Sequence, residues 1–126
     1  MRDYPKKSKK RKNKQPEYDL QVAVVNYLKL QYPNALYCAS AGGIRTSISQ
    51  AKKLKATGYV KGFPDLFIYE SKQQFHGLAI ELKVKGNYAK AHQKEWISNL
   101  EERGYMANVC TGFDQAKDLI DAYLNI

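Results

Sequence analysis

The chain has 126 residues, of which 44% are hydrophobic, and its formal net charge is +9. This size and composition fit one compact globular domain. No apolar run approaches the roughly 18 residues needed to cross a bilayer, and the basic N-terminus lacks the apolar stretch of a secretory signal, so we expect a soluble, cytoplasmic protein.

The positive charge is concentrated at the N-terminus. Residues 1–16 contain eight basic residues and one acidic residue, a net charge of +7, which leaves +2 for residues 17–126. This segment is nearly free of apolar residues and cannot offset the entropy cost of ordering, so we predict a disordered basic tail before a domain of residues 17–126. Such an arm commonly contacts nucleic-acid phosphates; the alternative is a tail that only increases solubility.

The first half of the domain is predicted to contain two helices and one strand. Pro16 and Glu17 favour a helix start, and apolar residues then recur at helical spacing. The expected elements are a helix over residues 16–31, a strand over residues 35–39 and a strongly basic helix over residues 47–56.

The second half begins with a predicted hairpin of strands at residues 66–69 and 78–84. A helix follows, with Asn87 as its N-cap and its end near Arg103, and then a strand over residues 105–110. Thr111 and Asp114 have the spacing of a capping box before a last amphipathic helix. The order α-β-α-ββ-α-β-α predicts an α/β fold with a central mixed sheet flanked by helices.

The two cysteines, Cys38 and Cys110, lie in predicted strands and lack the paired spacing of a zinc site. We expect both to be buried, reduced thiols. A disulfide would require the two strands to be neighbours, and a cytoplasmic location argues against it.

Side-chain alternation along the strand at residues 78–84 places Ala79, Glu81 and Lys83 on one face, opposite an apolar face. Asp65 lies just before the other hairpin strand, so it converges with Glu81 if the strands pair. Two carboxylates about 4 Å apart repel by several kcal/mol at an effective dielectric near 20, and a divalent metal relieves this repulsion. Mg²⁺ prefers such oxygen ligands and promotes phosphodiester hydrolysis. The alternative is a solvated strand face.

Two further polar residues share the apolar side of their predicted helices. Glu17 precedes Leu20 by three positions, and Gln93 precedes Trp96 by three. A helix cap is the alternative explanation for Glu17, and a satisfied hydrogen bond in the core is the alternative for Gln93.

Together these motifs resemble the virus-type replication-repair nuclease (VRR-NUC) family, a branch of the PD-(D/E)XK superfamily. The resemblance rests on Gly62-Phe63-Pro64-Asp65, Glu81-Leu82-Lys83 and Gln93, with support from Glu17, Gln21 and the Gly42-Gly43 loop, and it covers roughly residues 17–112. It implies a restriction-endonuclease-like core and hydrolysis of DNA with Mg²⁺ or Mn²⁺.

The resemblance also assigns roles to residues. It implies that Asp65, Glu81 and the backbone carbonyl of Leu82 bind the metal, while Lys83 serves the attacking water. Gln93 then supports the lysine, and Glu17 is the accessory acidic residue.

Small stand-alone members of the family, often encoded by phages, resemble homodimeric resolvases of four-way (Holliday) DNA junctions. No fused domain is visible in this sequence, so we expect a homodimer that acts on branched DNA, in the bacterial host cytoplasm if it is phage-encoded. No membrane and no small-molecule cofactor are expected.

Further DNA contacts are expected from basic residues on both sides of the motifs, where a phosphate backbone would pass. A solvated surface explains any one of them equally well. His92 is expected at the surface, without a catalytic role. The basic residues are Arg45, Lys52, Lys53, Lys55, Lys61, Lys85 and Lys90.

Other functions remain open at this level. The main competitor is a non-catalytic basic protein that binds nucleic acid through its tail. A flap-cutting or nonspecific nuclease uses the same core. A sequence-specific restriction-type nuclease ranks last, because the connections look too short to house base-reading loops.

Overall fold

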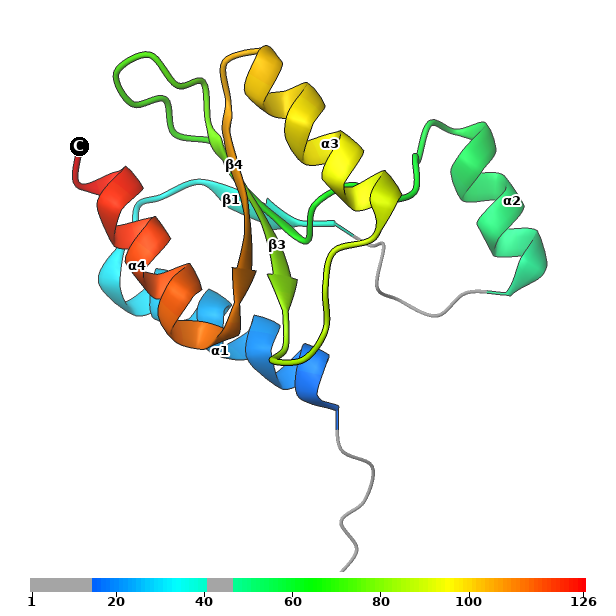
Figure 1. The fold of residues 1–126 in the computed structure, drawn as a ribbon, viewed down its shortest axis with the longest axis horizontal. Coiled ribbons are helices and arrows are strands. Elements are labelled where there is room, and N and C mark those ends of the chain that lie inside the picture. Colours follow the sequence, from blue (N-terminus) through cyan, green and yellow to red (C-terminus); the bar gives the residue numbers. More distant parts are fainter. Residues whose placement is uncertain (1–14, 41–46) are drawn as a thin grey trace, which may run out of the picture.

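The computed structural model describes residues 15–40 and 47–126. Figure 1 shows a sheet with helices on both of its faces. The predicted order of elements and the mixed α/β class are confirmed. The elements are α1 (Pro16–Gln31), β1 (Tyr37–Ala39), α2 (Ile48–Ala56), β2 (Leu66–Ile68), β3 (Leu78–Lys83), α3 (Ala91–Glu102), β4 (Met106–Thr111) and α4 (Gly112–Leu124). No helix among the described residues is both long and apolar enough to cross a membrane.

The sheet is mixed and has the strand order β1-β2-β3-β4. β1 and β2 are antiparallel, β2 and β3 form the predicted antiparallel hairpin, and β3 and β4 are parallel. Helix α3 supplies the long crossover that a parallel pair requires. Leu66, the first residue of β2, lies opposite Ile80 in the hairpin. This register decides which residues of β3 face the residues just before β2.

The two faces of the sheet bury different sets of side chains. Helices α1 and α4 cover one face, where a large apolar cluster includes Val24, Leu28, Ile80 and Ile120. Helix α3 covers the other face, where a smaller cluster contains Phe67, Ala79, Leu100 and Ala107. Alternation along β3 therefore sends even-numbered residues toward α1 and α4, and odd-numbered residues toward α3.

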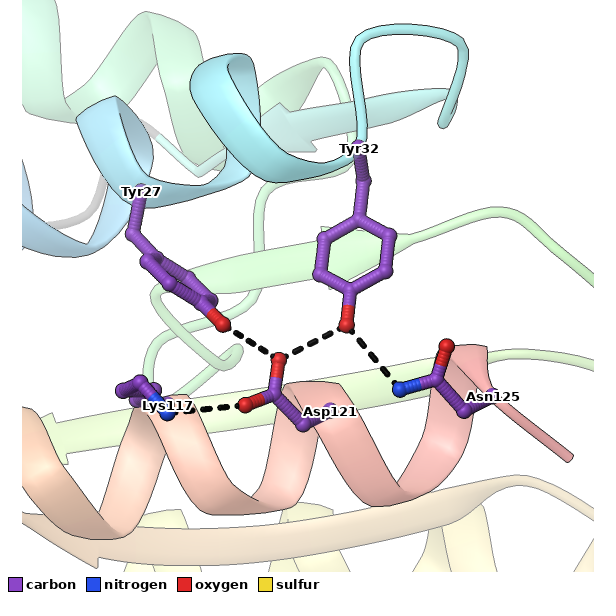
Figure 2. Close-up of polar contacts among 5 residues, drawn as sticks. All are labelled: Tyr27, Tyr32, Lys117, Asp121 and Asn125. Atoms are coloured by element: carbon purple, nitrogen blue, oxygen red, sulfur yellow. Dashed lines mark hydrogen bonds and ion pairs between the residues drawn. The ribbon is translucent and has the colours of Figure 1, made fainter.

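A polar cluster joins α1 to α4 at the edge of the larger core (Figure 2). The hydroxyls of Tyr27 and Tyr32 donate to Oδ1 of Asp121 at 2.5 and 2.7 Å, and Lys117 contacts Oδ2 at 3.0 Å. Asn125 donates to the Tyr32 hydroxyl at 3.2 Å. The two tyrosine hydroxyls hold the pKa of Asp121 below its usual value, because they stabilise its charged form.

Helix α2 stands apart from the rest of the fold (Figure 1). It contains no buried residue, and no other described helix or strand packs against it. Its own ends are well formed, because Ser47 and Gln50 make a reciprocal capping box. The helix therefore depends on local hydrogen bonds more than on burial of an apolar face.

The predicted start of α3 is wrong, whereas Thr111 precedes α4 as predicted but without the expected capping hydrogen bond. Helix α3 begins at Ala91 with Lys90 as its N-cap, so Asn87 lies outside the helix, in a turn where its backbone amide donates to the Val84 carbonyl. The Thr111 hydroxyl makes no cap for α4. Instead, the side-chain carbonyl of Gln115 accepts the Thr111 amide at 2.8 Å.

The cysteines are both free, as predicted, but only one is buried. Cys38 is exposed because β1 is an edge strand that no helix covers. Cys110 is buried, and burial raises the pKa of its thiol to about 11. Such a thiol stays protonated and unreactive near neutral pH.

Candidate active site

Asp65 is held at the end of the hairpin by the strand that carries Glu81. It directly precedes β2, so continuation of the antiparallel register places it opposite Glu81. The amide of Leu82 donates to Oδ2 of Asp65 at 2.7 Å. The Asp65 side chain thus accepts a hydrogen bond from a backbone amide of β3, at a position just before β2 begins. This contact fixes the direction of its carboxylate.

Glu81 is the one buried charged residue among those described, with 3% of its surface exposed. It lies on the face of β3 that α3 covers. Oε2 of Glu81 is 3.4 Å from the ammonium nitrogen of Lys83, whose side chain is 14% exposed. This burial contradicts the alternative of a solvated strand face, because a solvated glutamate would remain in water.

Burial and the neighbouring Asp65 carboxylate raise the pKa of Glu81 to about 7, although Lys83 acts in the opposite direction. Burial also raises the pKa of Asp65, against the lowering effects of the Leu82 amide and of Lys83. One lysine therefore does not compensate for two carboxylates confined in the same place.

This donor set fits a hard divalent cation. Two carboxylates that repel each other are relieved by a doubly positive ion, and Mg²⁺ commonly takes one or two protein carboxylates and completes its coordination with water and phosphate oxygens. Within the part of the chain that the structure describes, no third His, Cys, Asp or Glu joins Asp65 and Glu81.

Gly62 fixes the loop that carries Asp65 against the start of α3. Its φ is +94°, a conformation that favours glycine. A Cβ at this position would lie 2.7 Å from Cδ2 of His92 and 2.9 Å from its backbone oxygen. His92, which the sequence placed only at the surface, is therefore half-buried and packs beside the loop that carries Asp65.

In the structure, Gln93 and Glu17 make no described contact with the two carboxylates. The side-chain carbonyl of Gln93 accepts the Lys90 amide at 2.8 Å and so closes the first turn of α3. Glu17 is exposed in the first turn of α1, although its spacing from Val24 and Leu28 puts it on their side of the helix. No contact joins either residue to Asp65, Glu81 or Lys83 among the hydrogen bonds and ion pairs of the described residues.

The basic residues predicted to contact DNA are exposed wherever the structure describes them. They fall on α2, on the segment after it and on the connection between β3 and α3. Arg45 and the Gly42-Gly43 loop lie outside the described residues, as does the basic segment up to residue 14. The exposed residues are Lys52, Lys53, Lys55, Lys61, Lys85 and Lys90.

Sequence reasoning missed the amide of Leu82 as the group that orients Asp65, and it missed His92 as the residue against which the motif glycine packs. The first could have been found by extending the hairpin register one position beyond β2. The second required the tertiary position of α3, which no local pattern encodes.

The sequence pattern of the VRR-NUC domain family matches residues 3–114, and so begins within the basic segment. A solved structure described as a VRR_NUC domain protein superposes with a TM-score of 0.76 and 33% identity, covering 90% of this chain and 91% of that one. A second, described as a VRR_NUC domain, has a TM-score of 0.57 and 18% identity over 85% of this chain and 96% of its own, and supports the fold alone. No curated protein matches the chain.

Proposed function

This chain belongs to the VRR-NUC domain family, and from that premise we propose that it is a divalent-metal-dependent endonuclease that hydrolyses DNA phosphodiesters. The family identifies a nuclease domain, with DNA as the implied substrate. The finer proposal rests on one observation: two carboxylates, those of Asp65 and buried Glu81, lie together beside a single lysine, Lys83. Neither a binding module nor a structural protein requires this unfavourable arrangement of charge.

Asp65 and Glu81 would hold Mg²⁺ or Mn²⁺, and the Leu82 carbonyl is proposed as a further ligand. The cation supplies Lewis-acid activation of the phosphate and of the attacking water. The Leu82 amide keeps Asp65 oriented before substrate arrives, which lowers the cost of assembling the site. The Lys83 ammonium, next to Glu81, can orient the attacking water or stabilise the negative charge that develops on phosphorus.

Gln93 and Glu17 have supporting roles in this proposal. Gln93 fixes the first turn of α3, the helix whose start packs on the Asp65 loop. Glu17 is proposed as an accessory acidic residue that approaches the site when DNA and metal are bound.

We further propose that the substrate is branched DNA, in particular a four-way junction, and that the enzyme acts as a homodimer. Two copies related by a two-fold axis present two active sites, which suits paired incision of a symmetric junction. The exposed lysines of α2 and of the neighbouring connections would contact phosphates without reading sequence. Cutting of flaps or of any duplex by the same site is the alternative.

The test is cleavage of a labelled synthetic four-way junction and of a linear duplex of the same sequence, with Mg²⁺, Mn²⁺ or EDTA. Wild type should cut the junction on paired strands only when metal is present, and Asp65→Ala should not cut. Lys29→Ala, an exposed change on α1, serves as a control that should cut normally. Light scattering of the free protein should give twice the monomer mass.

Equal cutting of junction and duplex would favour the nonspecific alternative, and a monomer that cuts the junction would refute the homodimer. If DNA is bound but never cut with either metal, the nuclease proposal fails and the non-catalytic binding protein replaces it.

A further inference from the structure

An open groove of about 570 Å³ lies between α3 and the segment that follows α2. One wall is formed by the exposed side of α3, and the other by the last turn of α2 and the residues after it. Its volume falls in the range of about 300–1,000 Å³ that suits a small organic ligand. Its principal side chains are those of Lys55, Tyr59, Lys61, His92, Glu95 and Trp96.

The groove opens beside the loop that carries Asp65. Lys61 and His92 line it, and Gly62 packs directly on His92. Asp65 follows Gly62 by three residues, a span of at most about 11 Å in an extended chain. Successive nucleotides of one strand in B-DNA are separated by about 3.4 Å along the helix axis. A DNA strand at the Asp65–Glu81 site therefore reaches the groove within roughly three nucleotides.

Trp96 offers an aromatic surface that is already fixed in place. Its ring meets that of Phe63 edge to face, with centroids 5.0 Å apart and an interplanar angle of 88°. Its indole N–H donates to the Lys61 carbonyl at 3.1 Å. The rings of Tyr59 and His92 lie in the same lining. Stacking of a nucleobase on an aromatic side chain contributes about 1–3 kcal/mol and does not depend on the base.

The charge of the groove suits phosphate. Lys55 and Lys61 are exposed, and neither ammonium forms an ion pair in the described ranges 15–40 and 47–126. Helix α2 carries three lysines and no acidic residue. Glu95 supplies the one carboxylate of the lining, where it can accept hydrogen bonds from the amino groups of a base.

We propose that this groove binds an unpaired nucleotide of the DNA substrate, with the base stacked on Trp96 and adjoining phosphates at Lys55 and Lys61. The proposal rests on the proposed function in taking DNA as the substrate. A base inside an intact duplex enters such a site only after unstacking and unpairing, at a cost of a few kcal/mol. The groove therefore selects DNA whose bases are already unpaired, at a branch point, an end or a single-stranded stretch.

Trp96 is the single tryptophan of the chain, so its fluorescence reports on the groove alone. The experiment titrates the Asp65→Ala variant in EDTA with a short oligothymidine and, separately, with a blunt duplex of the same length. The single strand should quench the emission saturably. The affinity for the duplex should be at least about tenfold lower. Raised salt should weaken the binding of both.

Three substitutions locate the binding. Lys55→Ala and Lys61→Ala remove exposed charges without disturbing the core, and each should weaken oligothymidine binding about three- to tenfold. Tyr59→Leu should do the same by removing a ring. Lys29→Ala removes an exposed charge on α1, which covers the opposite face of the sheet, and should leave the affinity unchanged.

The proposal is overturned if anisotropy of a labelled oligothymidine reports binding while Trp96 emission stays constant, or if the duplex quenches as strongly as the single strand. It is also overturned if Lys29→Ala weakens binding as much as Lys55→Ala and Lys61→Ala. No cleavage is measured, so failure of the groove and failure of the nuclease assignment are distinguishable.

Discussion

The amide of Leu82 donates a 2.7 Å hydrogen bond to Oδ2 of Asp65, so the strand that bears Glu81 also orients the other carboxylate of the site. The contact joins residues 17 positions apart in the sequence. It also separates two functions of Asp65, which can be tested one at a time: acceptance of a hydrogen bond that holds the hairpin end, and the negative charge that a cation requires.

Asp65→Asn should abolish cleavage while leaving the fold intact. The asparagine carbonyl can still accept the Leu82 amide, but it carries no charge for a cation. We expect the cleavage rate to fall by roughly a hundredfold or more, with a melting temperature equal to or above that of wild type, because a buried repulsion is removed. Rates on the junction and thermal unfolding in EDTA measure the two effects. If the variant still cuts at the wild-type rate, Asp65 is not part of the active site.

The metal-free protein should become less stable as pH rises from about 4.5 to 7. The pKa of Glu81 is raised to about 7 in the folded state, so in this interval the folded state retains a proton that the unfolded state has lost. Stability then falls with increasing pH, by an amount of the order of 3 kcal/mol at most. Urea unfolding at several pH values in EDTA tests this.

Glu81→Gln is the matched variant for that experiment, because it keeps the size of the side chain and removes its titration. Its stability should change less over the same interval. Added Mg²⁺ should stabilise wild type at pH 8 more than it stabilises Glu81→Gln. A wild-type profile that rises through this interval, with Glu81→Gln behaving identically, would contradict the assigned pKa.

Gly62→Ala should impair both stability and cleavage. The new Cβ meets the His92 side chain and backbone at 2.7 and 2.9 Å, and the φ of +94° strains any other residue. We expect a loss of about 2–4 kcal/mol from strain and clash together, and a reduced cleavage rate because the Asp65 loop shifts.

Gly86→Ala provides the control for this glycine, because Gly86 has a φ of +95° but a Cβ added there would meet no atom within 4 Å. It should cost only the backbone strain, about 1–2 kcal/mol. Equal effects of the two substitutions on stability would show that packing on His92 contributes nothing.

Asp121→Ala should destabilise the protein without changing the intrinsic cleavage chemistry. Two tyrosine hydroxyls lose a charged acceptor, so we expect a cost of about 2–3 kcal/mol by urea unfolding. Lys117→Ala should cost less than Asp121→Ala, because its ion pair is partly exposed. Both variants should cut at the wild-type rate at a temperature where they remain folded, since the cluster joins α1 to α4 on the sheet face opposite α3.

The sequence contained enough information to place the central residues of the site. Alternation along β3 set Glu81 and Lys83 on one face, and the hairpin brought Asp65 opposite Glu81. These inferences worked because strand periodicity and hairpin pairing are local rules. The burial of Glu81 was not predictable in the same way, since it results from α3 covering that face.

The errors occurred at the starts of helices. Asn87 is a good cap by composition, but it lies in the turn after β3, and the helix begins only at Ala91, where Gln93 closes the first turn. Glu17 has the spacing of an inward residue, yet the first turn of α1 leaves it exposed. Choices of this kind depend on tertiary contacts that helical periodicity does not contain.

The isolation of α2 has a consequence for the order in which the molecule opens. A helix without buried residues is held by little more than its own backbone hydrogen bonds, so its amides should exchange with solvent at a rate set by local unfolding, while those of β3 await global unfolding. The part of the groove that Lys55 contributes thus belongs to a separate cooperative unit. DNA that bridges both walls should slow hydrogen exchange in α2 more than anywhere in the sheet.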